Sequence, residues 1–451
     1  MNKTKQGFFG TDGIRGRANS YPMNADIAMK LGMSAGKLFS RKSHKNRVLI
    51  GKDTRLSGYM LEPALTSGFV SVGMDVILVG PMPTPAVAML TKSLRADLGL
   101  MLSASHNLFY DNGIKLFNPF GYKISNEEEH LIEQGILNGV NLVDSSNLGR
   151  VKRLDDENGR YVEYLKSNFK NKSTLEGFRI VVDCANGASY RAAPALFSEL
   201  GAHVEAMHIS PNGININENC GSTSPQSMCA KVLTTRSDIG IALDGDADRL
   251  ILSDEKGKII DGDQLIAMIA KRWFFNNRLR KKAVVSTVMS NLGLEKYLKS
   301  LGLDLLRTNV GDRNVINCMK KEGINLGGEQ SGHIILSDFS TTGDGLLAAL
   351  QILEIMIEEQ KPLSELSQNI NLVPQVLKSV RIENDVSLEN SKIKKIISDS
   401  KNELGSEGRL LVRPSGTEPV IRIMVEGNDK KLIDSISELV SNKISEIDMA
   451  K

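Results

Sequence analysis

Apolar positions in the first third of the chain follow two alternating periods, one typical of helices and one typical of buried strands. Asn24 precedes a helical pattern and can cap it, because its side-chain oxygen can accept a free backbone N–H of the first turn. The apolar face of that helix consists of Ile27, Leu31, Ala35 and Leu38. Short apolar runs then predict three buried strands, at residues 48–50, 75–80 and 98–102. Helices between such strands predict right-handed crossovers and a mostly parallel sheet.

The same alternation starts again twice further along the chain. An apolar run at residues 179–183 opens a second unit, which extends to a strand at 239–243. A third unit begins with a strand at 283–287 and ends in a helix whose apolar face contains Leu346, Leu350, Leu353 and Ile357. No fixed short period relates these units, so the pattern predicts the recurrence of an architecture rather than a solenoid.

The last part of the chain has a different pattern. Residues 361–375 contain two prolines and predict a linker. Beyond it, strands are predicted at 376–382, 409–413 and 420–426, flanked by charged helices such as 431–447. The predicted fold class is α/β, with three related α/β domains that contain mixed or parallel sheets and a C-terminal α+β domain. The expected boundaries are 1–158, 159–256, 257–372 and 373–451.

Composition and charge narrow the class of protein. A chain of 451 residues with 41% hydrophobic and 24% charged residues is expected to form several globular domains. The net charge of +3 argues against nucleic acid or an anionic membrane as the main partner. The four cysteines lack zinc-ligand spacing, and the sequence shows neither a signal-peptide pattern nor an apolar run of membrane-spanning length. We therefore expect a cytoplasmic protein with free thiols.

Two of the predicted strands end in polar loops, which is where ligands of open α/β sheets bind. The first loop, SASHN at 103–107, contains Ser105. A serine can carry a phosphoryl group when charge-stabilising groups are near, and Lys115 is close enough in sequence to be one of them. For this segment alone, a helix cap or a polar turn is an equally simple interpretation.

The second loop, DGDADR, places Asp244, Asp246 and Asp248 at alternate positions and ends in Arg249. Three carboxylates so close together repel one another unless a cation lies among them, and oxygen ligands favour Mg²⁺. An EF-hand is excluded, because Arg249 stands where that loop requires glycine and the following residues are typical of a strand. A solvated acidic turn is the remaining alternative.

Three further segments are weak signals by themselves. GGEQSGH at 327–333 offers polar groups that suit sugar hydroxyls, and its histidine fits either proton transfer or core packing. RPSGTEP at 413–419 combines hydroxyls and backbone N–H groups with flanking arginines, as in a phosphate site, although a hairpin turn also explains it. FGTDGIRG at 9–16 contains Arg15, which can reach a phosphate, but the segment alone is typical of a turn.

Together, these segments resemble the α-D-phosphohexomutase superfamily over essentially the whole chain. FGTDGIRG, SASHN, DGDADR, GGEQSGH and RPSGTEP occur in the family's order. Two of them, FGTDGIRG and GGEQSGH, point to the glucosamine branch of the superfamily, as does TNVGDR at 308–313. The mannomutase/glucomutase branch typically carries histidine where this chain has Asp312. The resemblance also implies that the four domains surround a central cleft.

The resemblance implies an activity and a role for each motif. The expected enzyme is an isomerase that interconverts glucosamine 6-phosphate and glucosamine 1-phosphate for amino-sugar nucleotide and cell-wall precursor synthesis. Ser105 would be phosphorylated, and one Mg²⁺ would be bound by that phosphoserine with Asp244, Asp246 and Asp248. Arg15, Lys115 and Arg249 would stabilise the transferring group or assist proton transfer. The sugar would be bound by Glu329, Ser331 and His333, and the non-reacting phosphate by Arg413, Ser415, Gly416, Thr417 and Arg422.

The sequence leaves several points open. A sugar 1,6-bisphosphate would act as activator, and a homodimer is possible. Where the family has proline after the SASHN motif, this chain has Leu108, which restores a backbone N–H and predicts a more mobile loop. Alternative functions are phosphomannomutase or phosphoglucomutase, a Mg²⁺-dependent phosphatase with an aspartate nucleophile, and a non-catalytic sugar-phosphate sensor.

Overall fold

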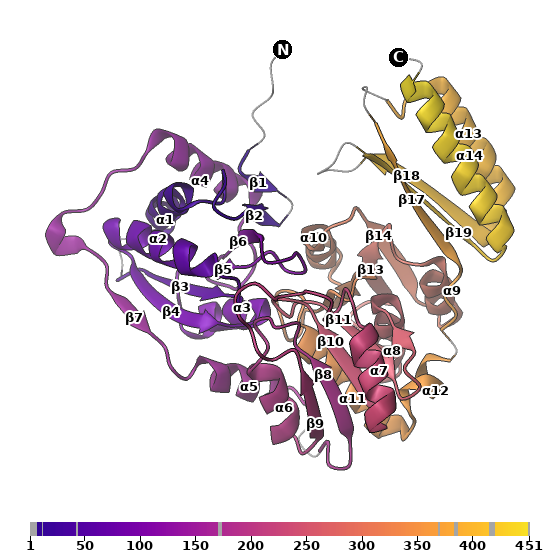
Figure 1. The fold of residues 1–451 in the computed structure, drawn as a ribbon, viewed down its shortest axis with the longest axis horizontal. Helices are drawn as coiled ribbons and strands as arrows, with labels where there is room; N and C mark the ends of the chain where they lie inside the picture. Colours follow the sequence, from indigo (N-terminus) through magenta and orange to yellow (C-terminus); the bar gives the residue numbers. More distant parts are fainter. Residues whose placement is uncertain are drawn as a thin grey trace.

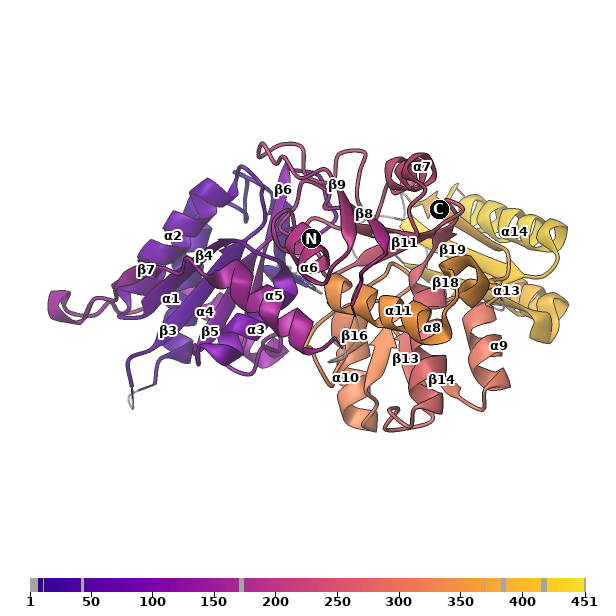
Figure 2. The same ribbon diagram turned by 90° about the horizontal axis from the view of Figure 1, so that it is seen from below.

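The computed structural model describes residues 7–10, 12–41, 44–169, 174–368, 370–382, 387–414 and 420–449. These residues form four β-sheets that follow one another along the chain (Figure 1). We call the parts of the chain that carry them the first, second, third and fourth domains. The first domain lies at one end of the molecule, the second and third lie side by side in the middle, and the fourth lies at the opposite end (Figure 2).

The first domain contains a seven-stranded sheet with the order β1-β2-β6-β5-β3-β4-β7. Its strands are β1 (Phe9–Gly10), β2 (Gly13–Arg17), β3 (Arg47–Lys52), β4 (Asp75–Pro81), β5 (Leu98–Leu102), β6 (Asp111–Phe117) and β7 (Val151–Arg153). Its helices are α1 (Ala25–Phe39), α2 (Gly58–Ser71), α3 (Thr84–Ser93), α4 (Asn126–Asn138) and the short 3-10 helix η1 (Ser145–Asn147), and α5 (Glu157–Ser167) leads into the second domain. The predicted cap of α1 is confirmed, because Asn24 Oδ1 accepts the backbone N–H of Ile27 at 3.0 Å. Leu38, by contrast, is exposed at the end of that helix.

The second and third domains are smaller. The second has the strand order β12-β11-β10-β8-β9 and the third β14-β13-β15-β16. Elements of the second domain are β8 (Arg179–Asp183), α6 (Ala192–Glu199), β9 (His203–Met207), α7 (Gln226–Thr235), β10 (Ile239–Leu243), β11 (Leu250–Asp254) and β12 (Ile259–Ile260). Those of the third are α8 (Gly262–Phe275), β13 (Ala283–Thr287), α9 (Leu292–Ser300), β14 (Asp304–Thr308), α10 (Asp312–Glu322), β15 (Leu326–Gly328), β16 (Ile334–Leu336) and α11 (Gly345–Glu359).

One strand order recurs in the first three domains. The order is β4-β3-β5-β6 in the first, β9-β8-β10-β11 in the second and β14-β13-β15-β16 in the third. In each case three strands are parallel and the last one runs antiparallel to its neighbour. The prediction of three related α/β domains with mixed sheets is therefore confirmed. The connections from the third to the fourth of these strands, residues 103–110, 244–249 and 329–333, occupy equivalent positions.

The fourth domain is a separate α+β unit, as predicted. Its antiparallel sheet has the order β17-β19-β18, and its two long helices cover one face of that sheet (Figure 1). Its elements are β17 (Gln375–Arg381), α13 (Ser391–Leu404), the 3-10 helix η2 (Gly405–Glu407), β18 (Gly408–Pro414), β19 (Val420–Gly427) and α14 (Lys430–Met449). The predicted linker contains a short helix, α12 (Leu363–Ser367), before it reaches this domain. Asn291 fixes the end of the linker through two hydrogen bonds to Val373. Its Nδ2 donates to the Val373 carbonyl at 3.0 Å, and its Oδ1 accepts the Val373 N–H at 2.9 Å.

A single apolar interior connects the first three domains. It includes Val87 of α3, Leu165 of α5, Leu196 of α6, Ile269 of α8 and Leu350 of α11. Such a shared interior holds the three equivalent connections in fixed positions relative to one another. Among the helices of the described residues, none is both long and apolar enough to cross a membrane.

Candidate active site

The predicted phosphoserine loop follows β5 and meets the acidic loop of the second domain. Ser105 is 1% exposed, and its Oγ donates a hydrogen bond to Asp244 Oδ2 at 2.5 Å. Its φ of +52° lies in the left-handed region, which residues other than glycine rarely adopt, so neighbouring groups must hold this backbone. The structure thus brings together two loops that sequence analysis singled out separately.

Arg55 holds the Ser105 loop from the side of the first domain. Its side chain is fully buried, and its Nε donates to Asp53 Oδ2 at 2.7 Å. The guanidinium also donates to four loop carbonyl oxygens, those of Ser105 (2.9 Å), Asn107 (2.8 Å), Leu108 (2.5 Å) and Asp111 (3.1 Å). These bonds fix the loop on both sides of Leu108, so they compensate for the missing proline and do not support the predicted gain in mobility.

The second domain holds the same loop from the other side. Asn217 Nδ2 donates to the carbonyl oxygens of Ser105 and Asn107, at 2.8 Å and 2.9 Å. Gly245 of the acidic loop lies so close that a Cβ atom there would be 2.6 Å from the carbonyl oxygen of Ser105. Glycine is therefore required at this position by the contact between the two loops.

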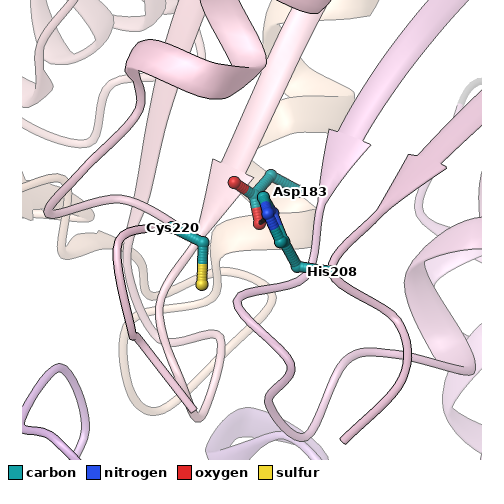
Figure 3. A group of neighbouring side chains, drawn as sticks. All are labelled: Asp183, His208 and Cys220. Carbon is teal, nitrogen blue, oxygen red and sulfur yellow. Dashed lines mark ion pairs between the residues drawn. The ribbon is translucent and has the colours of Figure 1, made fainter. Parts of the chain in front are cut away.

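Besides the acidic loop, which is described below, one more group of possible metal ligands is found among the described residues, near the chain segment that carries Asn217. It consists of Asp183, His208 and Cys220, at the carboxyl end of β8, after β9 and before α7 (Figure 3). The Asp183 carboxylate already accepts two backbone N–H groups, each at 2.9 Å, and lies 3.0 Å from His208 Nδ1. Burial, together with the charge of Asp183, raises the pKa of Cys220 to about 12, so its thiol keeps its proton at neutral pH. We interpret this group as an anchor for the Asn217 segment.

The acidic loop itself fits a bound cation. One carboxylate oxygen from each of Asp244, Asp246 and Asp248 lies within 4.8 Å of the other two, and all three residues are buried. Oδ1 of Asp246 and Oδ1 of Asp248 are buried without a hydrogen-bond partner among the described residues. Burial and the two neighbouring carboxylates raise the pKa of Asp244 to about 8. A hard divalent ion would supply the missing partners and relieve the repulsion.

Lys115 provides one positive charge at this loop. It lies on β6 with its side chain 1% exposed, and its Nζ donates to Asp246 Oδ2 at 2.8 Å and to Asp248 Oδ2 at 3.0 Å. Burial alone would lower the pKa of Lys115, but the surrounding carboxylates raise it well above its usual value. Lys115 is therefore a fixed ammonium group beside Ser105. Thr84, the first residue of α3, also donates to Asp246 Oδ2, at 2.5 Å.

Two arginines add positive charge around the serine. Arg15 forms an ion pair with Asp12, and Arg249 lies 3.9 Å from Asp248 Oδ1. The Nε group of each arginine is buried without a hydrogen-bond partner among the described residues. Burial and these two guanidinium groups lower the pKa of His106 to about 4. The region next to Ser105 therefore combines the acidic loop with two guanidinium groups that contain unused N–H donors, which suit a phosphoryl group.

The third domain contributes the connection between β15 and β16. Glu329 Oε1 accepts the backbone N–H of Gly311 at 3.3 Å, and Ser331 is exposed. His333 is buried, with Nδ1 3.5 Å from Asp248 Oδ1. Its Nε2 accepts the backbone N–H of Gly343 at 3.2 Å, which assigns the ring proton to Nδ1. His333 therefore lies against the acidic loop through Asp248, and its roles in sugar binding and proton transfer stay predictions.

The fourth domain places two arginines opposite each other in the sheet. Arg413 on β18 is paired in register with Arg422 on β19. Burial and the charge of Arg422 lower the pKa of Arg413. Like charges at such positions repel, so the pair favours a bound anion. The other predicted phosphate ligands, Ser415, Gly416 and Thr417, lie outside the described residues.

Sequence analysis missed four residues of this site: Asp12, Arg55, Thr84 and Asn217. Asp12 lies inside the FGTDGIRG motif, three positions before the candidate Arg15, so its position was a usable signal. The other three lie outside every motif, and their roles depend on contacts between distant parts of the chain.

Comparison with known proteins agrees with this geometry. Family models for phosphoglucomutase/phosphomannomutase match four segments: alpha/beta/alpha domain I at residues 6–141, domain II at 159–257, domain III at 261–372 and the C-terminal domain at 377–443. A solved phosphoglucomutase/phosphomannomutase family protein from Burkholderia thailandensis superposes with a TM-score of 0.80. That likeness covers 96% of this chain and 95% of the other, at 25% identity.

A buried serine loop, an acidic loop and an arginine pair on this four-domain fold are consistent with a phosphohexomutase. The chain belongs to the phosphoglucomutase/phosphomannomutase family, and within it to the phosphoglucosamine mutases. It is 58% identical to phosphoglucosamine mutase of Parvibaculum lavamentivorans over 95% of this chain and 96% of the relative. It is 57% identical to that of Mesorhizobium japonicum over 97% of this chain and 98% of the relative.

Proposed function

We propose that this chain interconverts glucosamine 6-phosphate and glucosamine 1-phosphate through phosphorylated Ser105. The observation that carries the proposal is the contact of Ser105 Oγ with Asp244, beside the ammonium group of Lys115. These groups come from separate motifs, and together they provide a carrier for a phosphoryl group, a cation site and fixed positive charge. The product would enter the synthesis of UDP-N-acetylglucosamine and cell-wall precursors.

The first half-reaction moves a phosphoryl group from the enzyme to the sugar. The bond between phosphorus and Ser105 Oγ breaks, a bond to the 1-hydroxyl oxygen of glucosamine 6-phosphate forms, and the hydroxyl proton replaces the phosphoryl group on Ser105. The 1,6-bisphosphate then turns round and returns its 6-phosphoryl group to Ser105, which leaves glucosamine 1-phosphate. Free sugar 1,6-bisphosphate would act as an activator by phosphorylating Ser105 in the same way.

Other residues of the site neutralise charge on the phosphoryl group and bind the sugar and the distal phosphate. Mg²⁺ held by Asp244, Asp246 and Asp248 with the phosphoserine would neutralise charge on the transferring group. Lys115, Arg15 and Arg249 stabilise the same charge, because phosphoryl transfer depends mainly on positioning and electrostatics. Glu329 and Ser331 bind sugar hydroxyls. The clamp for the distal phosphate consists of Arg413, Ser415, Gly416, Thr417 and Arg422.

The decisive variant is Ser105→Ala. Wild-type protein incubated with glucose 1,6-bisphosphate should show one phosphoryl adduct by intact mass and convert glucosamine 6-phosphate. The variant should show no adduct and lose turnover by orders of magnitude. Ser103→Ala is the control for the adduct only, because Ser103 lies in the same loop and donates to Asp53, while its Oγ also accepts the backbone N–H of Ser105. Normal turnover by Ser105→Ala refutes the carrier role, and release of inorganic phosphate as main product favours a phosphatase.

Substrate choice is tested separately, by comparing rates with glucosamine, glucose and mannose phosphates on one phosphorylated sample. A preference for the mannose or glucose substrate contradicts the assignment to glucosamine. A cytoplasmic location, a possible homodimer and the absence of nucleic-acid partners stay predictions.

A further inference from the structure

Six ionisable side chains lie in a ring of neighbouring groups where the first three domains meet, in which His333 and Asp312 are neighbours without a hydrogen bond between them. An acid alternates with a lysine or histidine around the ring, in the order Asp12, Lys115, Asp248, His333, Asp312 and Lys123. Four neighbouring pairs lie 3.0 to 3.7 Å apart, and the two contacts of Lys123 are shorter. The most exposed side chain of the ring is 19% exposed. Four of its members have no part in the mechanism above: Asp12, Lys123, Asp312 and His333.

Asp12 connects the two catalytic cations of the first domain. Its Oδ2 pairs with Arg15 and lies 3.5 Å from Lys115 Nζ. Its Oδ1 pairs with Lys123. Because the two oxygens have different partners, the orientation of the carboxylate is set by Lys123 on one side and by the catalytic cations on the other.

Lys123 also joins the first domain to the third. It follows β6, and its Nζ donates to Asp312 Oδ2 as well as to Asp12. Asp312 is the first residue of α10, where a helix favours an acidic side chain. Burial alone would lower the pKa of Lys123, but the two carboxylates raise it, so the bridge keeps its charge. Asp12 is therefore held in place by a helix of another domain.

We propose that Lys123 and Asp312 are positioning residues for phosphoryl transfer. Through Asp12, they hold Lys115 and Arg15 at the Ser105 loop when the first and third domains are in contact. Without Lys123, one oxygen of Asp12 loses its cation in a buried setting, and the carboxylate can turn toward Lys115. Lys115 would then be drawn away from Asp246 and Asp248. The inference rests on the proposed function, because it assumes that Lys115 and Arg15 act on the phosphoryl group.

The experiment compares Lys123→Met with a matched control at the same domain contact. Arg313 follows Asp312 directly and pairs with Glu129 of α4 at 2.9 Å, so it also joins the third domain to the first. Among the described residues Arg313 forms no hydrogen bond or ion pair with Asp12, and the two charges interact only at longer range. Lys123→Met should lower kcat roughly 10- to 100-fold, with KM for glucosamine 6-phosphate changed less than about threefold. Arg313→Met should keep kcat within about threefold.

Two further variants separate positioning from loss of structure. Lys123→Arg should recover most of the lost kcat, because it restores a cation between the two acids. In Lys123→Met, the carboxylates of Asp12 and Asp312 face each other without a cation, and this repulsion can prevent folding. The double variant Lys123→Met/Asp312→Asn removes the Asp312 charge together with the lysine and therefore avoids it. This double variant should melt close to the control and still lose kcat.

Three outcomes decide the matter. Equal kcat in Lys123→Met and Arg313→Met overturns the inference, because both residues would then only hold the domains together. Failure of Lys123→Arg to recover any activity overturns it as well. Wild-type protein that phosphorylates Ser105 but does not isomerise any hexosamine phosphate refutes the proposed function instead, so the two failures are distinguishable.

Discussion

Replacing Arg55 with methionine removes the buried group that holds the Ser105 loop. The side chain has no exposed surface, and it donates one bond to Asp53 and four to loop carbonyl oxygens. Methionine fills a similar volume without any donor. Ser103 then remains as the side-chain donor to Asp53. The Asp53 carboxyl is buried, and this burial already raises its pKa in the wild-type protein. The variant therefore tests whether the loop depends on this one guanidinium.

The size of the effect follows from the two kinds of contact that are lost. Removing one partner of a buried ion pair costs about 3–5 kcal/mol, because the other charge stays buried. Each bond from a charged donor to a carbonyl contributes about 1.5–3 kcal/mol, but the loop can turn its carbonyls to water, so these values do not add. We expect the first unfolding transition to lose about 3–5 kcal/mol, and kcat to fall at least about 100-fold because Ser105 is no longer held.

Urea unfolding followed by circular dichroism measures the first quantity, and a coupled mutase assay measures the second. Hydrogen exchange of residues 103–111 reports the loop directly and should show loss of protection there. Arg160→Met is the control, since Arg160 is half-exposed in an ion pair with Asp156 and should contribute less than about 1 kcal/mol. Arg55→Lys keeps a charge near Asp53 but cannot match the five donors, so activity should fall more than stability.

The reasoning is refuted if Arg55→Met unfolds within about 1 kcal/mol of wild type and keeps its kcat. A large loss of stability with unchanged exchange in residues 103–111 would also contradict it. In that case the ion pair with Asp53 would matter for the domain as a whole, and the loop would be held by its other contacts, with Asn217 and Asp244.

Three further predictions concern the acidic loop and the phosphate clamp. A carboxyl with a raised folded-state pKa stabilises the fold below its unfolded pKa and loses this effect as pH rises toward the folded value, about 8 for Asp244. The melting temperature of the metal-free protein should therefore decrease as pH is raised from 5 to 8.5. Added Mg²⁺ should increase the melting temperature more at pH 8.5 than at pH 5, and equal increases at both pH values contradict this. Gly245→Ala should push the loop from Ser105 and lower kcat at least about tenfold, whereas Gly159→Ala, with open space around its Cβ, should not. Arg413→Ala should raise KM for glucosamine 6-phosphate at least about tenfold with a smaller change in kcat, because the distal phosphate is bound in ground and transition states alike.

Strands were predictable where burial is complete on both faces. The predicted runs at 98–102, 179–183, 239–243 and 283–287 coincide with β5, β8, β10 and β13, in which every residue but the exposed Arg179 is buried. Such strands form continuous apolar runs in the sequence because helices cover the sheet on both sides. The antiparallel strand β6 was not predicted, because polar residues of the active site interrupt its pattern.

The residues that hold the site were not predictable in the same way. Arg55 has a charged and polar neighbourhood in sequence, which is typical of a surface turn. It is buried only because the fold brings the carbonyls of a loop about fifty positions later around it. Lys123 likewise meets Asp312 through the packing of two domains. Motifs identify groups that react, whereas groups that position them depend on the tertiary arrangement.

The recurrence of one strand order indicates that the first three domains derive from copies of one unit. Each copy of the repeated unit ends its third strand in a hairpin at the same place, and the three hairpins now differ in function. One carries the serine, one the acids and one the groups that suit a sugar. A triplicated ancestor would have presented three short, solvent-facing loops to one point before any of them had a function. Specialisation then required changes in loop residues, while each sheet kept the shared order of four strands. Exchange of the third hairpin between relatives is accordingly the simplest way to redesign the sugar that such an enzyme accepts.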